Sequence, residues 1–119
     1  MSIDYILGPR EPNGTYDREA ILNWFRGRSG YESPNSRQAV RDRGDNYVLF
    51  DLAEEPVLDP ELDEERPIFI EAHTGVGGGE KAFMENVAEI RELCQAFDLL
   101  VCDPQGERFA FLEPAEVLG

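Results

Sequence analysis

The sequence predicts a single α+β domain, a two-layer sandwich in which two helices pack on one face of a mainly antiparallel sheet. Three observations lead to this fold class. The 119 residues, of which 41% are hydrophobic, are enough to bury one core without disulfides or metal. Two stretches have the periodicity of amphipathic helices, and six have the composition of strands. Their order along the chain is β-α-β-β-β-α-β-β, and we find no internal repeat.

The N-terminal part predicts a strand followed by a helix. Residues 3–7 are largely apolar and end at a Gly-Pro pair, as expected of a strand in the sheet. Thr15 or Asp17 then offers an N-cap for a helix that ends near Gly27. The apolar positions of this helix fall on one face: Ala20, Ile21, Trp24 and Phe25. We expect Trp24 to anchor the helix on the sheet rather than to stack on a ligand.

A polar loop separates this helix from a predicted β-hairpin. The first strand, residues 37–42, is polar and weak, whereas the second, residues 47–52, is rich in β-forming side chains. The turn lies at residues 43–46, because Gly44 and Asn46 are residue types that tolerate a positive φ. We therefore interpret the Arg-Gly-Asp sequence at 43–45 as part of a turn and not as an integrin-binding motif.

The central part, residues 67–102, predicts a strand, a helix and a second strand that supply much of the core. Residues 67–72 form the first strand, a glycine-rich loop follows, and residues 79–97 form the clearest helix of the chain. Apolar residues recur along this helix at spacings of three and four: Phe83, Val87, Ile90, Leu93, Cys94 and Phe97. Leu99–Cys102 then predicts a buried strand, and residues 108–112 predict a final strand with alternating polarity.

The charge of the chain is strongly negative and unevenly placed. The formal net charge is −14. Residues 1–50 hold seven basic and seven acidic side chains, whereas residues 51–119 hold four basic and eighteen acidic ones. Such a field repels phosphate backbones and anionic membranes and attracts basic proteins. We therefore expect no direct binding to nucleic acid or to membranes, and a basic protein as the partner.

Neither targeting segments nor cofactor motifs are recognisable. No apolar run reaches the ~20 residues of a membrane helix, and the N-terminus lacks the basic and apolar regions of a secretory signal. We therefore expect a cytoplasmic protein. Cys94 and Cys102 match no zinc or redox motif, and we predict that both are reduced, buried thiols. The sequence thus indicates no metal and no cofactor.

An acidic segment precedes the central strand. Residues 51–65 hold eight acidic side chains and no basic one, and Pro56 and Pro60 exclude a continuous helix, so we expect an acidic loop at about 53–65. The candidate partner-binding residues are its carboxylates: Glu54, Glu55, Asp59, Glu61, Asp63, Glu64 and Glu65. Their mutual repulsion lowers stability unless a function offsets it. Two alternatives stay open, a merely solvated surface and an adaptation to high salt, while the spacing does not fit a calcium-binding EF-hand loop.

A second candidate site combines the only histidine with the glycine-rich loop after it. Its members are His73, Thr74, Gly75, Gly77, Gly78 and Gly79. A glycine loop before a helix can bind an anion through backbone N–H groups, and Glu71 with His73 offers an acid and a base. However, Glu80 and Ala82 break the phosphate-binding pattern GxxxxGKS/T, and Glu80 also breaks the dinucleotide pattern GxGxxG. We assign no catalytic residue.

Three stretches resemble a group of known proteins. They are Tyr31-Glu32-Ser33-Pro34-Asn35, Tyr47-Val48-Leu49-Phe50-Asp51-Leu52 and Phe97-Asp98-Leu99-Leu100-Val101-Cys102-Asp103-Pro104-Gln105. In this order they resemble small uncharacterised bacterial proteins that include immunity-type proteins of toxin systems. The resemblance implies a stand-alone bacterial protein of the cytoplasm that binds another protein, and it carries over no catalytic residue.

The sequence therefore favours a non-enzymatic, acidic protein-binding module. The hypothesis is an immunity or inhibitor protein whose carboxylates block a basic partner such as a nuclease-like toxin. The alternative is a small enzyme, or an anion- or ligand-binding domain, centred on His73 and the loop at 75–79. Formation of a homo-oligomer stays open in both cases.

Overall fold

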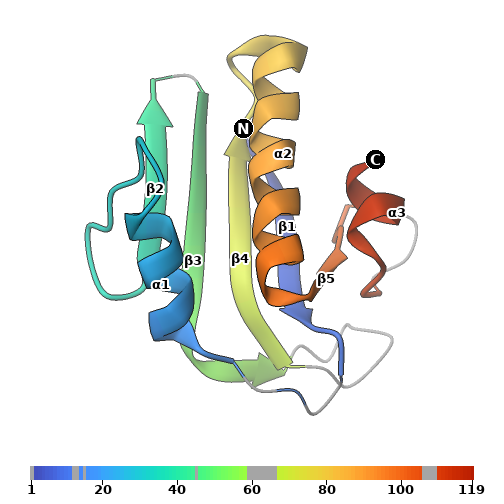
Figure 1. Cartoon of the computed structure of the whole chain (residues 1–119). Coiled ribbons are helices and arrows are strands. Elements are labelled where there is room, and N and C mark those ends of the chain that lie inside the picture. The colour runs from blue at the N-terminus through green and yellow to red at the C-terminus, as the bar shows by residue number, and fades with distance from the viewer. Residues whose placement is uncertain (1, 12–13, 15, 45, 59–66, 106–109) are drawn as a thin grey trace.

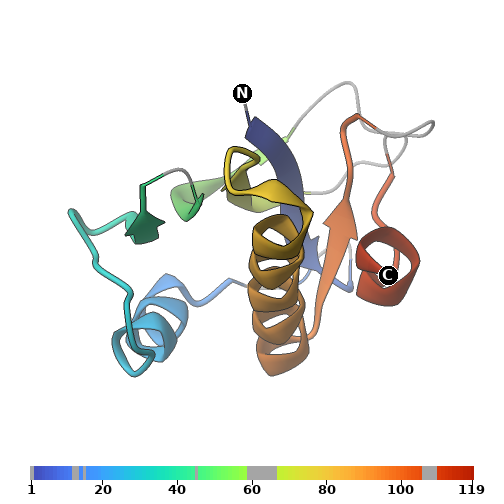
Figure 2. The ribbon, with the colours of Figure 1, turned by 90° about the horizontal axis from the view of Figure 1, so that it is seen from above.

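The structure, a computed structural model, describes residues 2–11, 14, 16–44, 46–58, 67–105 and 110–119. Its elements follow in the order β1 (Ser2–Pro9), α1 (Arg18–Arg26), β2 (Gln38–Arg43), β3 (Asn46–Leu58), β4 (Pro67–Gly75), α2 (Gly79–Phe97), β5 (Leu99–Cys102) and α3 (Pro114–Leu118) (Figure 1). The strands form one open antiparallel sheet in the order β2-β3-β4-β1-β5. Helices α1 and α2 lie on the same face of it (Figure 2). The predicted single α+β domain is thus confirmed.

The register of the strands decides which side chains share a face. Because side chains alternate along a strand, residues paired across strands point to the same side of the sheet. Tyr5, Ala72 and Phe50 are paired in this way across β1, β4 and β3, and all three are buried in the main core. The neighbouring residues Asp4 and His73, also paired, therefore point to the opposite face.

The main core fills the space between the sheet and the two long helices. Its helical part consists of Ile21, Leu22 and Phe25 from α1 and of Val87, Ile90, Leu93 and Cys94 from α2. The Phe25 and Phe50 ring centroids lie 4.7 Å apart. Trp24 is half-buried against this core, with its ring beside Phe97 of α2, whereas the predicted contact was with the sheet. Burial of a Leu or Phe side chain stabilises the fold by about 1.5–3 kcal/mol, so these side chains hold the helices on the sheet.

The ends of the two long helices agree with local sequence signals. Asp17, one of the two predicted N-caps of α1, accepts a hydrogen bond from the Ala20 N–H at 3.0 Å. Asp98 ends α2 in the left-handed conformation, with a φ of 53°, and its N–H donates to the Cys94 carbonyl. A short polar side chain tolerates this conformation better than most residues do. The chain can therefore turn directly from α2 into β5.

β3 is longer than predicted and includes the start of the acidic segment. It continues to Leu58, with Val57 paired to Ile68 after an irregularity that lies between Leu52 and Val57. Pro56, which has no backbone N–H, lies within that irregularity, where a regular ladder hydrogen bond is not required. The prediction of a loop at 53–65 is therefore wrong for residues 53–58, and residues 59–65 lie outside the described residues.

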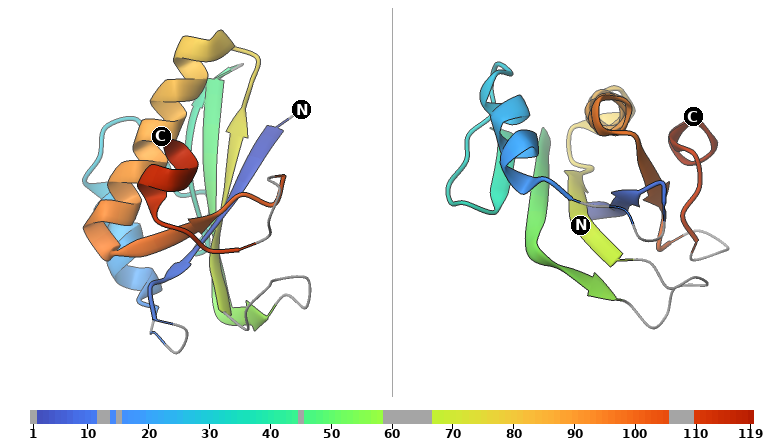
Figure 3. Two further views of the ribbon diagram at one scale, coloured as in Figure 1. Left: turned by 90° about the vertical axis from the view of Figure 1, so that its right-hand side faces the viewer. Right: turned by 60° about the horizontal axis from the view of Figure 1, so that its bottom comes forward.

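The C-terminal part differs from the predicted final strand. Residues 106–109 lie outside the described residues, and of residues 110–112 only Leu112 pairs with the sheet, through a single bridge to Val101. Pro114 and a capping box between Glu113 and Glu116 begin α3 directly afterwards. The prediction of a strand at 108–112 is thus wrong for residues 110–112, which make one bridge, and the short helix that follows was not predicted. α3 lies at the β5 end of the sheet, beside α2 (Figure 3).

Each edge strand of the sheet makes one bridge to a segment outside it. Val40 of β2 and Glu32 exchange both backbone hydrogen bonds at 2.8 Å. Val101 of β5 and Leu112 do the same, at 2.9 and 2.8 Å. The two edges of the sheet therefore lie against backbone of the same chain.

Candidate functional site

The sheet face opposite α1 and α2, which we call the uncovered face, carries the histidine of the predicted sites. Figure 2 shows both long helices together on the other side. Two cross-strand rows lie on the uncovered face: Val40, Leu49, His73 and Asp4 in one, and Gln38, Asp51, Glu71 and Ile6 in the other. Ile6 is buried in a small second core with Leu100, Cys102 and Phe111. The uncovered face is therefore accessible mainly over β2, β3 and β4.

His73 lies between two carboxylates on this face. Its Nδ1 is 2.8 Å from Asp4 Oδ1, and its Nε2 is 3.5 Å from Glu71 Oε2. The side chain of His73 is 27% exposed and that of Glu71 is 55% exposed. The contacts to Asp4 and Glu71 orient the imidazole ring and leave it at the surface. The two carboxylates place negative charge on this face. Within the described ranges, His, Cys, Asp and Glu side chains form no group of three or more that could hold a metal ion.

Two carboxylates of the uncovered face lie directly opposite each other. Asp51 of β3 and Glu71 of β4 are partners in the antiparallel register. Like charges at such positions destabilise a sheet. Arg37 Nη2 lies 3.3 Å from Asp51 Oδ1, and His73 lies beside Glu71, so each carboxylate has one nitrogen-bearing neighbour. This acidic pair was not singled out in the sequence, because only the strand register brings its members together.

The glycine-rich loop does not join His73 in one site. Thr74 is buried and faces the opposite way, donating its hydroxyl to the Ile3 carbonyl at 2.7 Å, and Gly75 is the last residue of β4. Gly77 and Gly78 follow in the exposed turn before α2, and Gly79 is the first residue of α2. The alternative ligand site, His73 with the loop, is thus divided between the uncovered face, the core and the start of α2. This division weakens the enzyme interpretation.

The glycines before α2 have conformational and packing roles. Gly79 has a φ of +89°, which L side chains rarely adopt. A Cβ added to Gly78 would lie 2.9 Å from the Ala82 Cβ and 3.2 Å from the Asn46 Cβ, so the backbone passes close to both residues. Glu80 occupies the first turn of α2, where its carboxylate interacts favourably with the helix dipole. The loop is therefore explained by the tight connection between β4 and α2.

The structure describes two of the predicted partner-binding residues. Glu54 and Glu55 are exposed near the end of β3, and Glu54 Oε1 is 3.7 Å from Arg18 Nη1. The others, Asp59, Glu61, Asp63, Glu64 and Glu65, lie outside the described residues. The structure shows that Asp51, Glu54 and Glu55 belong to the same strand, β3. Glu54 lies beside Arg18 of α1, whereas Asp51 lies on the uncovered face, so these two acidic residues of β3 do not share one surface.

Most arginines of the described residues are held by carboxylates of the same chain. Arg10 pairs with Asp98 and Glu113, Arg28 with Glu89 and Glu92, and Arg41 with Glu89. Arg18 and Arg37 pair with Glu54 and Asp51. These five arginines are thus used within the fold, while carboxylates such as Glu55, Glu71 and Glu85 remain exposed. The acidic excess therefore lies at the surface.

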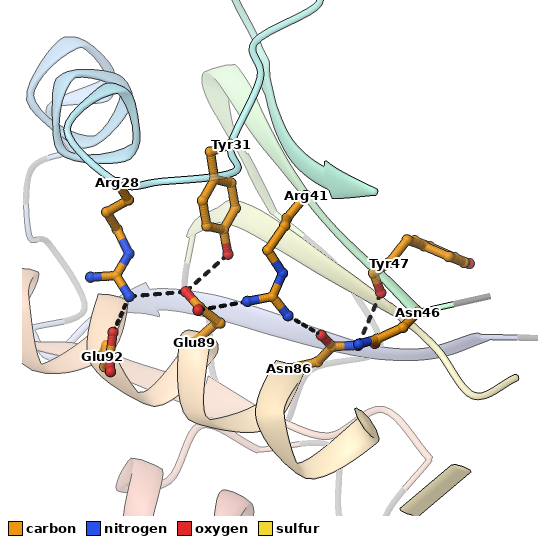
Figure 4. Close-up of polar contacts among 8 residues, drawn as sticks. All are labelled: Arg28, Tyr31, Arg41, Asn46, Tyr47, Asn86, Glu89 and Glu92. Carbon is orange, nitrogen blue, oxygen red and sulfur yellow. Dashed lines mark hydrogen bonds and ion pairs between the residues drawn. The ribbon is translucent and has the colours of Figure 1, made fainter. Parts of the chain in front are cut away.

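A buried polar network links α2 to β2 and β3 on the covered face (Figure 4). Arg41 is 5% exposed and Asn86 is fully buried. Arg41 donates to Glu89 Oε1 and to Asn86 Oδ1, each at 2.7 Å. Asn86 Nδ2 donates to Asn46 Oδ1 at 2.8 Å and to the Tyr47 carbonyl at 3.1 Å. The network fixes α2 over the β2–β3 hairpin.

The same network extends to the segment that follows α1. Arg28 Nη2 donates to Glu89 Oε2 at 3.0 Å and also contacts Glu92, while the Tyr31 hydroxyl donates to Glu89 Oε2 at 3.1 Å. Burial, and then the Glu89 carboxylate, raise the pKa of Tyr31 well above its usual value, so it stays a neutral donor. The sequence analysis missed this network. Its signal was Asn86 and Glu89, polar residues three apart beside the apolar positions Val87 and Ile90.

The remaining features do not form a reactive centre. Burial raises the pKa of Cys94 to about 12, which keeps the thiol protonated and unreactive, and Cys102 is also buried and reduced, as predicted. A pocket of about 250 Å³ lies where the C-terminal end of α2 meets α3. Of its charged lining residues, Arg10 pairs with both Asp98 and Glu113, and Arg91 donates to the Leu118 carbonyl. The pocket therefore has a structural explanation.

Comparisons of the chain with protein-family models, with curated proteins and with solved structures find no match. In the part of the chain that the structure describes, no helix has the length and apolar character needed to cross a membrane. Function is therefore argued from the geometry and charge of the residues themselves.

Proposed function

We propose that the chain is a non-enzymatic, acidic protein-binding module that binds a basic protein partner. Within this class, the best-supported role is that of an immunity or inhibitor protein that blocks a nuclease-like toxin. Its carboxylates would occupy the cleft that the toxin uses for phosphate groups. The chain would then act by steric and electrostatic blockade, without chemistry of its own.

One observation carries the proposal. The arginines Arg10, Arg18, Arg28, Arg37 and Arg41 are tied to carboxylates within the fold, whereas the net charge of the chain is −14. The surplus carboxylates are thus free to create a negative field at the surface. Such a field accelerates the encounter with a basic partner by about 10- to 1,000-fold at low salt. The resemblance to immunity-type proteins is consistent with this role.

The test uses purified basic nuclease domains of bacterial toxins. We expect the chain to inhibit at least one such nuclease stoichiometrically, and we expect the association rate to fall steeply as salt is added. Reversal of Glu54 and Glu55 to Lys should slow association and flatten its salt dependence. The matched control reverses Glu11 and Glu85, which are exposed before α1 and on α2. A chain that binds none of these nucleases at low salt would contradict the proposal.

A further inference from the structure

We infer that the partner docks on the uncovered face over β2, β3 and β4, and that it presents an arginine to the carboxylates of Asp51 and Glu71. This inference rests on the proposed function and names the surface that contacts the partner. The surface, which we call the docking face, consists of Gln38, Val40, Leu49, Asp51, Glu71 and His73. The sequence predicts the partner contact in the acidic loop at 53–65 instead, and of the docking face it singles out only His73 and Glu71, as part of the alternative ligand site.

The docking face has the composition of a protein interface. Val40 and Leu49 are register partners at its centre, and both remain half-buried rather than fully buried in the free chain. Asp51, Glu71 and His73 surround them with polar groups. An apolar centre with a polar rim is the usual anatomy of a specific protein contact. The covered face has no such surface, because α1 and α2 pack on it.

The opposed carboxylates indicate what the partner supplies. Asp51 and Glu71 are directly opposite in the register, an arrangement that disfavours the free chain. A guanidinium placed between them would remove the repulsion and form charge-assisted hydrogen bonds to both. Arginine suits this position better than lysine because its planar group donates several hydrogen bonds in fixed directions. Of these two carboxylates, Arg37 contacts that of Asp51. The side chain of Glu71 is 55% exposed and is therefore accessible to an arginine of the partner.

Charge also excludes a second copy of the chain as the occupant. Two docking faces brought together would oppose Asp51 and Glu71 to the same carboxylates, with a net charge of −14 on each chain. Like charges across an interface disfavour association. The complementary occupant is therefore a basic protein surface with an apolar residue beside its arginine.

The experiment uses the full chain labelled with ¹⁵N and a synthetic helical peptide that carries arginines along one side with leucines between them. Amide shifts are mapped during titration at low salt, and a peptide with Glu in place of Arg is the control. We expect the largest shifts at Val40, Leu49, Asp51 and Glu71. We also expect the Asp51→Asn, Glu71→Gln double variant to weaken peptide binding by about tenfold or more. The matched variant Glu85→Gln, Glu116→Gln carries the same change of charge and should bind normally.

Each other outcome overturns the inference in a recognisable way. Shifts confined to residues 54–58 and beyond, with normal binding by the Asp51→Asn, Glu71→Gln variant, would place the contact elsewhere and leave the proposed function intact. Equal weakening by both double variants would reduce the contact to general attraction by the field and overturn the docking face. Failure of the arginine peptide to bind at low salt would count against both the docking face and the proposed function. The double variant also removes the contacts of Asp51 with Arg37 and of Glu71 with His73, so its circular dichroism spectrum and thermal unfolding are compared with those of the native chain before binding is measured.

Discussion

The two faces of the sheet differ in how their charged side chains are paired. Under the helices, Arg41 and Glu89 are largely withdrawn from water, and Asn86, Arg28 and Tyr31 form hydrogen bonds with them, although the Nε atoms of Arg41 and Arg28 have no partner among the described residues. On the uncovered face, Asp51 and Glu71 are opposed to each other at the surface. Charged side chains can be buried under the helices because almost all of them have a partner of opposite charge. Carboxylates that repel each other lie instead at the surface, where water screens them. The covered face therefore holds the fold together, whereas among the described residues the carboxylates of the uncovered face remain in contact with water.

The largest expected difference between the two faces is in the stability of variants at two neighbouring residues of β3. Phe50 is fully buried under the helices, and Leu49 points to the uncovered face. We expect Phe50→Ala to lower the free energy of unfolding by about 3–5 kcal/mol and Leu49→Ala by about 1 kcal/mol. Urea denaturation of both variants measures the difference. Equal losses would show that the uncovered face is buried in the folded state in solution.

The next effect concerns the buried polar network. Arg41→Met should lower the free energy of unfolding by about 3 kcal/mol, because it removes cationic and hydrogen-bonding partners from Glu89 and Asn86. The double variant Arg41→Met, Glu89→Leu should recover part of this loss, since a buried pair can be replaced by apolar packing. Arg26→Met, at an exposed arginine of α1, is the control. A single variant as stable as the native chain would show that the network is not needed.

A pH dependence tests the covered face through Cys94. Burial raises the pKa of this thiol from 9.0 to about 12. In the unfolded chain the thiol ionises near its ordinary value, so its contribution to stability is complete below about pH 9 and is lost as the pH rises toward 12. Cys94→Ala should therefore flatten the fall of stability in this range by up to about 1.4 kcal/mol per pH unit. Parallel pH curves for the two proteins would contradict the burial of the thiol.

The smallest effect has the opposite sign and lies on the uncovered face. Glu71→Gln removes one of the two opposed carboxylates and should raise the free energy of unfolding by about 0.5 kcal/mol. Glu85→Gln, on the exposed side of α2, should change it by less. Thermal unfolding at low salt is the measurement. A destabilised Glu71→Gln variant would mean that the contact between Glu71 and His73 outweighs the repulsion from Asp51.

The fold was largely predictable because its signals are local. Apolar spacing predicted α2, the Asp17 cap predicted the start of α1, and β-forming residues predicted β3 and β5. The errors lie where a local signal was ambiguous. Pro56 suggested a loop, although an irregularity in β3 accommodates it, and the alternation at 108–112 suggested a strand where only Leu112 makes a bridge.

The candidate site was less predictable because it depends on register. His73 and Thr74 are adjacent in sequence and were grouped together, yet alternation along β4 sends them to opposite faces. Asp51 and Glu71 are far apart in sequence and become neighbours only through the pairing of β3 with β4. Composition predicts that the surface charge is negative, and the pairing of strands determines which charged side chains lie next to each other.

The bridges at Glu32 and Leu112 have a consequence for how the chain behaves at high concentration. An open sheet edge can recruit strands of other molecules and seed fibres, whereas at both edges of this sheet a segment of the same chain already takes part of the available backbone. The two bridges, together with mutual repulsion between copies of net charge −14, reduce the backbone that another molecule can pair with. We therefore expect the chain to stay monomeric at concentrations at which a sheet with open edges would aggregate.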